Sequence, residues 1–333
     1  MKLGRIARET IDGTAARLVA VVPEKGYVVD LVTAEHARLR ARGASDEAAR
    51  RLAVAAFPGS LTAALGAGDE FMERAAGAVA GAGEAGRVAI ADVTWLPAAD
   101  PTVMRDCMAF EQHMLNSFGK VGLTVPDLYY ELPAYYKGSP EGLIGHDAVV
   151  RWPAYTDHMD YELEIGFVLG RGGSDMTPEQ GKAAIFGVTI YNDFSARDIQ
   201  TREMKLQLGP AKGKDFNTGL GPWITTVDEV DIANLTMLAR VNGEEWSRGN
   251  SGTITWQPGE IVAYCSYGEN LLPGDVVGSG TLGGGCGLEL GRRLQPGDVV
   301  ELEISGVGVL RNRMGEKEAP GWTPTARRRT VVA

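Results

Sequence analysis

The sequence contains few cysteines and no long hydrophobic run. Its three cysteines, Cys107, Cys265 and Cys286, are odd in number and far apart, which gives neither a disulfide framework nor the spacing of a zinc motif. We therefore expect buried structural thiols. No stretch approaches the roughly 18 consecutive apolar residues of a membrane span, and the N-terminus has no apolar signal region. A cytoplasmic protein without a membrane partner is the expectation.

Positive charge is also scarce. The 33 Lys and Arg residues against 43 Asp and Glu residues give a net charge of −10 and a pI of about 5.1. Nucleic-acid binding needs a surplus of cations on one face, so nucleic acid is not expected as a main partner. At 333 residues, with 44% hydrophobic residues, the chain can bury a substantial core and exceeds the usual size of one domain.

The chain changes character at the proline-containing stretch 97–101. Before it, residues 3–31 alternate between apolar and polar and predict antiparallel strands with turns at Asp12-Gly13 and Glu24–Gly26, while residues 34–80 are Ala-rich and helical in period. Later, short apolar runs punctuated by Gly and Pro favour an antiparallel or mixed β architecture. We predict an α+β, mostly β protein with a small N-terminal α+β domain at 1–95 and a larger domain at 96–333.

Carboxylates are concentrated in the segment from His158 to Glu164, which precedes an apolar run. If this segment is a strand, alternation places Asp160, Glu162 and Glu164 on one face with His158. Two readings remain open at this point. The face is either a solvated outer sheet surface or a site where a divalent cation compensates the repulsion between like charges.

Further acids support the second reading. Asp193 ends the apolar run AAIFGVTIYN, as a residue presented to a cleft from the end of a buried strand would do. Asp106 and His113 are seven residues apart, and in a helix they would share one face, about 10 Å apart along the axis. His113 is either a general base or an ordinary structural histidine. Carboxylates without His or Cys partners favour Mg²⁺, Mn²⁺ or Ca²⁺ over zinc.

Ordered motifs over about residues 95–310 resemble the fumarylacetoacetate hydrolase family. Asp106 with His113 is followed by DYELEIGFVLG, YNDFSARDIQ, LGPAKGKDFNTGLGPW, GSGTLGGGCG and CGLEL in the family's order. The resemblance implies a mixed β-roll or sandwich catalytic domain after a smaller N-terminal domain, usually in a homodimer. It also implies a small keto acid as substrate and no organic cofactor.

The resemblance assigns roles to individual residues. It implies that Mg²⁺, or Ca²⁺ or Mn²⁺, is held by Asp106, Glu162, Glu164 and Asp193. It makes His113 the base that activates water and Glu289 of CGLEL the carboxylate that orients it. The positions that surround the metal and substrate in the family are matched by Arg197, Gln200, Lys214, Thr218 and Thr281.

The activity implied is hydrolysis of a carbon–carbon bond in a β-diketo acid or acylpyruvate. Met108, Gly122 and Met204 stand where fumarylacetoacetase has substrate-binding tyrosine, arginine and tyrosine residues, so a less polar or differently shaped acyl arm is expected. Asn116 replaces the glutamate of the acylpyruvase branch, which leaves Glu289 as the partner of His113. The alternatives are a decarboxylase, isomerase, tautomerase or hydratase of the same family, and a non-catalytic binding protein.

Overall fold

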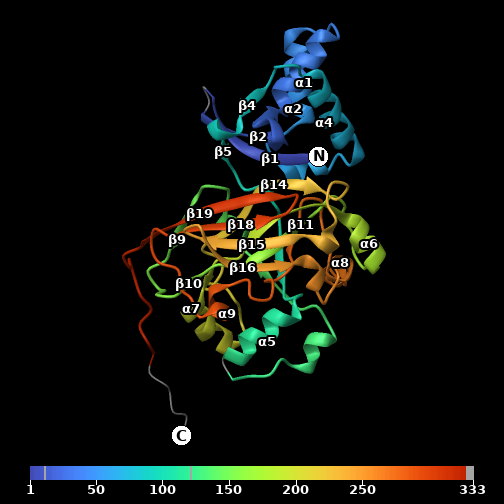
Figure 1. Cartoon of the computed structure of the whole chain (residues 1–333). Helices are drawn as coiled ribbons and strands as arrows, with labels where there is room; N and C mark the ends of the chain where they lie inside the picture. The colour runs from blue at the N-terminus through green and yellow to red at the C-terminus, as the bar shows by residue number, and fades with distance from the viewer. Residues whose placement is uncertain (11–12, 121, 328–333) are drawn as a thin grey trace.

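The computed structural model describes residues 1–10, 13–120 and 122–327. A helical N-terminal part lies at one end of a β-rich body, and the helices α5, α7 and α9 lie at the opposite end (Figure 1). The α+β, mostly β class predicted from the sequence is confirmed. Within these described ranges, no helix has the length and hydropathy that a membrane crossing requires.

The N-terminal part consists of antiparallel strands covered by helices. β1, β2 and β3 pair in chain order, as the alternating pattern over residues 3–31 predicts, and β4 pairs with β3; Gly26 closes the turn between β2 and β3 with a φ of 70°. Asp12, in the other predicted turn, lies outside the described residues. Ser60 caps the start of α3 by accepting a hydrogen bond from the backbone N–H of Ala63, and the helices of this part confirm the helical period predicted over residues 34–80. The elements are β1 (Lys2–Thr10), β2 (Gly13–Val22), η1 (Pro23–Lys25), β3 (Tyr27–Asp30), α1 (Leu31–Ala41), α2 (Asp46–Ala56), α3 (Leu61–Leu65), α4 (Asp69–Gly81), β4 (Arg87–Ala89), η2 (Ile90–Asp92) and β5 (Thr94–Trp95).

One large sheet runs from the N-terminal strands into the rest of the chain, in the order β4-β3-β2-β1-β14-β12-β11-β17-β6-β7. The two parts join where β1 pairs with β14, with Lys2 opposite Thr225 and Leu3 opposite Ile224. β11 is buried at all 7 positions, which explains its nearly continuous apolar sequence. The strands introduced here are β6 (Met104–Cys107), β7 (Tyr135–Gly138), β8 (Leu143–Ile144), β11 (Leu163–Leu169), β12 (Ile185–Asn192), β14 (Thr218–Thr226) and β17 (Val276–Gly278).

A second sheet, in the order β16-β15-β18-β19-β9, packs against one face of β11. Ile165 and Phe167 share an apolar cluster with Val300 and Leu302, whereas Val168 belongs to the cluster beneath the N-terminal helices. Because side chains alternate along a strand, Glu164 lies on the face of β11 that is turned away from the second sheet. The new elements are β9 (Val149–Trp152), α6 (Pro178–Ala184), β15 (Thr236–Val241), β16 (Glu244–Asn250), α8 (Pro258–Ser266), β18 (Val299–Ile304) and β19 (Gly308–Lys317).

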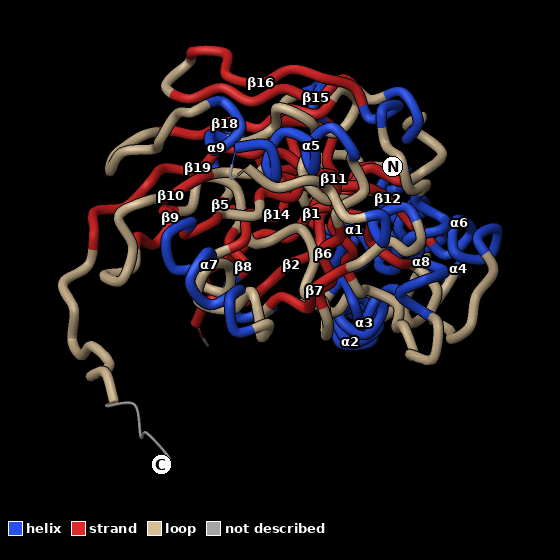
Figure 2. Tube along the Cα trace, turned by 90° about the horizontal axis from the view of Figure 1, so that it is seen from below, coloured by secondary structure: helices blue, strands red, loops and turns tan. Residues whose placement is uncertain are grey.

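Of the remaining elements, α5, α7 and α9 lie on the side of the molecule turned to the viewer in Figure 2. Short strands β10 and β13 pair with each other, with Asp160 opposite Ser195. These elements are α5 (Glu111–Lys120), η3 (Asp127–Tyr130), η4 (Pro140–Gly142), β10 (Met159–Asp160), β13 (Ser195–Ala196), α7 (Arg197–Glu203), η5 (Met204–Leu206), η6 (Ile232–Asn234), η7 (Ser251–Thr253) and α9 (Gly287–Leu290).

Two local predictions are wrong. Asp106 and His113 do not share a helix, because Asp106 lies in β6, between β17 and β7, whereas His113 belongs to α5. The segment from His158 to Glu164 is not one strand either, since β10 ends at Asp160 and β11 begins at Leu163. The three acids therefore point to different hydrogen-bond partners. All three acids are buried, so the solvated-face reading is also wrong: Asp160 is 0%, Glu162 4% and Glu164 0% exposed.

Candidate active site

Three buried carboxylates converge from three neighbouring segments of the large sheet. Asp106 comes from β6, Glu164 from β11 and Asp193 from the residue after β12, and one oxygen of each lies within 4.8 Å of the others. β17 separates β6 from β11, with Gly278 opposite both Asp106 and Gly166. A Cβ on Gly278 would stand 2.3 Å from Asp106 Oδ1 and 3.1 Å from Glu164 Oε2. Glycine at this position therefore lets the acids meet across an intervening strand.

The cluster is electrostatically costly by itself. Burial, together with the neighbouring Asp193, raises the pKa of Asp106 well above its usual range, and burial with Asp106 does the same to the pKa of Glu164. Within the described residues, Asp106 Oδ1 and Asp193 Oδ1 have no hydrogen-bond partner. Buried acids with unpaired oxygens are destabilising unless a cation compensates them, so this donor set fits a divalent cation with oxygen ligands.

Glu162 lies outside that group of acids and is held by cations of the chain. Its Oε1 accepts a hydrogen bond from Arg197 Nη2 at 2.8 Å, and its Oε2 accepts one from Lys214 Nζ at 2.5 Å. Burial alone would raise the pKa of Glu162, but Arg197 and Lys214 outweigh it and hold this pKa below its usual range. Lys214 also donates to Asp193. Lys214 thus connects Glu162 to the cluster, and a direct metal contact of Glu162 stays a prediction.

The other predicted residues line the same region. Thr281 Oγ1 donates to Glu164 Oε1 at 3.1 Å, and Arg197 Nη1 donates to Gln200 Oε1 at 3.3 Å. Thr218 begins β14, where its neighbour Gly219 pairs with Asn192, next to Asp193. Thr281, Gln200 and Thr218 therefore lie close to the residues that form the site. Their roles in binding metal or substrate stay predictions.

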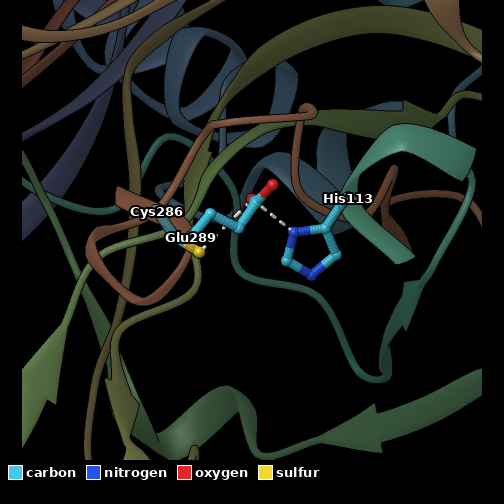
Figure 3. Close-up of side chains that lie close together, drawn as sticks. All are labelled: His113, Cys286 and Glu289. Carbon is cyan, nitrogen blue, oxygen red and sulfur yellow. Dashed lines mark hydrogen bonds and ion pairs between the residues drawn. The ribbon is translucent and has the colours of Figure 1, made fainter. Parts of the chain in front are cut away.

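His113 and Glu289 meet although 176 positions separate them in the sequence. His113 Nδ1 lies 2.7 Å from Glu289 Oε1, and the other ring nitrogen points away from the glutamate (Figure 3). Glu289 Oε2 accepts hydrogen bonds from Asn116 Nδ2 at 2.6 Å and from the Gly284 N–H at 2.8 Å. Burial is the largest influence and acts to raise the pKa of Glu289, but the hydrogen bond and charge of His113, together with the hydrogen bonds from Asn116 and Gly284, lower this pKa below its usual value. This pair can accept a proton on a ring whose orientation is fixed.

Sequence reasoning missed the role of Asp160, which joins the two halves of the site. Its Oδ1 accepts from the Gly287 N–H at 2.7 Å and its Oδ2 from the Leu288 N–H at 2.9 Å, so it anchors the start of the short helix that carries Glu289. Arg197 Nη2 donates to the same Oδ2 at 2.7 Å while it also holds Glu162. No local pattern could have revealed these contacts, because the partners lie 37 and more than 120 positions away.

Tyr136 was also missed. Its hydroxyl donates to Asp193 Oδ2 at 2.8 Å, and its ring lines a pocket of about 700 Å³ together with Tyr135, Tyr264 and Tyr267. By contrast, two of the positions that depart from the substrate contacts of fumarylacetoacetase are exposed, with Met108 at 42% and Met204 at 46%. These two positions therefore lie apart from the buried residues that hydrogen-bond to the acids, and they can differ without changing the carboxylate cluster.

Comparisons with known proteins show which family the sequence matches. Residues 102–315, more than half of the chain, match the family model described as the C-terminal part of fumarylacetoacetate (FAA) hydrolase. An uncharacterized protein of Methanocaldococcus jannaschii is 33% identical over 196 residues, which cover 58% of this chain and 78% of that protein.

Solved structures of two enzymes share the fold. The 5-carboxymethyl-2-hydroxymuconate delta-isomerase from Mycobacterium smegmatis is similar with a TM-score of 0.65 and 23% identity, covering 96% of this chain and 100% of that one. Maleylpyruvate hydrolase from Sphingobium sp. SYK-6, in complex with manganese(II) and pyruvate, is similar with a TM-score of 0.68 and 20% identity, covering 96% and 100%. At these identities the likeness is one of fold.

Proposed function

The chain belongs to the fumarylacetoacetate hydrolase family, and we propose that it hydrolyses a carbon–carbon bond in a β-diketo acid or an acylpyruvate-like substrate. The observation that carries the proposal is the His113–Glu289 pair beside the buried acids. Hydrolysis needs a base with a fixed orientation to activate water, and His113 with Glu289 supplies one. Binding a metal ion and a keto acid would need only the buried carboxylates. The solved structures that share the fold include an isomerase and a hydrolase, and we propose hydrolysis as the more specific function.

The acids are proposed to hold a divalent cation, Mg²⁺ first, with Mn²⁺ or Ca²⁺ as alternatives. Asp106, Glu164 and Asp193 supply oxygens that already converge, and Glu162, which Lys214 connects to Asp193, would be the fourth ligand. When bound, such an ion supplies a Lewis acid that polarises a keto oxygen of the substrate.

The chain's own groups then divide the remaining work. His113 takes a proton from water through the nitrogen that is not bonded to Glu289, and the resulting hydroxide adds to a carbonyl carbon. As the carbon–carbon bond breaks, its electron pair passes to the departing keto-acid fragment. Lys214, 4% exposed and held between Glu162 and Asp193, is the buried cation proposed to stabilise that developing negative charge. Glu289 keeps the ring oriented and stabilises its protonated form.

An isomerase or decarboxylase is the second candidate, because the same fold carries an isomerase in the solved structures. Those reactions need the acids and a cation but no hydroxide nucleophile. Retention of the His113–Glu289 pair favours hydrolysis. A non-catalytic binding protein would consume no substrate at all.

Mass spectrometry of the products from a panel of acylpyruvates and β-diketo acids separates these functions. We expect water to be added and the carbon chain to be split, with turnover lost in EDTA and restored by excess Mg²⁺ because the acids need their cation. Loss of CO₂ would identify a decarboxylase and an unchanged mass an isomerase. Full activity after complete metal removal would overturn the proposed metal requirement.

A further inference from the structure

A second group of potential ligands lies at the base itself. One ligand atom each of His113, Cys286 and Glu289 lies within 4.8 Å of the others, and Figure 3 shows the three side chains turned toward one another. We propose that Zn²⁺, or another thiophilic divalent cation, binds to these residues and thereby removes His113 from the reaction. The effect on turnover rests on the proposed function, whereas the binding does not.

The distances are close to those that zinc requires. A tetrahedral Zn²⁺ with bonds of about 2.0–2.3 Å keeps its ligand atoms roughly 3.3–3.6 Å apart. Cys286 Sγ already lies 3.4 Å from Glu289 Oε1, and His113 Nδ1 lies 2.7 Å from the same oxygen. The imidazole has to withdraw by less than about 1 Å to reach the zinc value. His113 has room to do so because its side chain is 13% exposed, on the solvent side of the group.

The donor types separate this group from the carboxylate cluster. Imidazole, thiolate and carboxylate together suit zinc, whereas the all-oxygen set of Asp106, Glu164 and Asp193 suits Mg²⁺ or Mn²⁺. A mixture of cations should therefore divide between the two groups according to ligand chemistry. The solvent side at His113 leaves a fourth position for water.

The surroundings of Glu289 already favour such coordination. Asn116 Nδ2 and the Gly284 N–H both donate to Oε2, which leaves Oε1 directed at His113 and Cys286. Partners that fix one oxygen of a carboxylate orient the other as a metal ligand. The cysteine spacing in the sequence gives no zinc motif, because the fold brings Cys286 to a histidine on a distant helix.

Binding is balanced by proton release. The Cys286 thiol loses its proton to solvent when its sulfur becomes a ligand, and neutral His113 exchanges its contact with Glu289 for the cation. Nothing is oxidised or reduced. With the cation on Nδ1, the proton of the neutral ring stands on Nε2, the nitrogen that would take a proton from water, so His113 can no longer act as the base.

Co²⁺ is a suitable spectroscopic probe, since it takes the same ligands as Zn²⁺ and gives a sulfur-to-cobalt charge-transfer band when a thiolate binds. We expect the wild-type protein to develop this band, Zn²⁺ to remove it, and Mg²⁺ to leave it unchanged. Cys286→Ser should abolish the band. Cys265→Ser, the same change at a buried thiol on α8 outside the group, should retain it.

Turnover provides the second measurement. With Mg²⁺ in excess, Zn²⁺ at ten times its dissociation constant should lower the rate of the wild-type protein roughly tenfold by mass action. A missing band in the wild-type protein, or an equal band in Cys286→Ser, would overturn the site. A normal band without inhibition would overturn the block of the base. If no diketo acid is consumed at all, the proposed function fails while the band still reports on the site.

Discussion

Asp106→Asn is expected to inactivate the enzyme while making the metal-free protein more stable. The change removes one ligand and one charge from a cluster in which burial and like charges already raise the pKa of Asp106 and Glu164. Turnover should fall by roughly 10³-fold or more through loss of the cation. The metal-free protein should gain about 0.5–2 kcal/mol, the gain typical of relieving a destabilised functional site.

Thermal unfolding in EDTA and in Mg²⁺, together with rate measurements, tests both halves of this prediction. The wild-type protein should show a higher Tm in Mg²⁺, and Asp106→Asn should show a higher Tm in EDTA but almost no response to Mg²⁺. Asp92→Asn, the same change at an exposed position, controls for the loss of one charge. An Asp106→Asn protein that is both less stable in EDTA and still responsive to Mg²⁺ contradicts the assignment of the cluster.

His113→Ala is expected to lower kcat by about 10²–10⁴-fold, the usual contribution of a positioned general base. The Mg²⁺-dependent rise in Tm should remain as in the wild-type protein, because His113 contacts Glu289 rather than the carboxylate cluster. Glu289→Gln should lower kcat in the same direction, since the ring loses the carboxylate that stabilises its protonated form.

His36→Ala is the matched control, because His36 lies on α1 in the N-terminal part and pairs with Asp46. It should leave kcat unchanged. If His113→Ala keeps the wild-type kcat, His113 is not the base, and the family's isomerase or decarboxylase chemistry becomes the better account of the site.

Regular local patterns predicted the strands and helices well. The alternation over residues 3–31 predicted β1, β2 and β3, and the helical period over residues 34–80 predicted the helices that follow them. Such patterns depend only on residues close together in the sequence, so they can be recognised without knowing the fold.

The site could be predicted only through the ordered family motifs. Spacing placed Asp106 and His113 on one helix, which is wrong, because β17 and β7 hold Asp106 in a strand. Gly278 decides whether the acids can meet, yet its importance depends on a register between distant strands. The partners of Asp160, among them Arg197 and the backbone N–H of Gly287, likewise can be identified only from the folded structure. Contacts between residues far apart in sequence are set by topology, which local spacing does not encode. The predicted boundary at 95/96, the homodimer and the cytoplasmic location stay predictions.

The hydrogen bonds between β1 and β14 bear on how the protein can be divided. The segment 102–315 that matches the family contains β14 but not β1, its neighbour in the sheet. Cutting the chain there would leave β14 as an open edge with unpaired backbone groups, a template for pairing with other molecules. The N-terminal part therefore also covers this edge of β14 against aggregation, and a form shortened for crystallisation should keep β1.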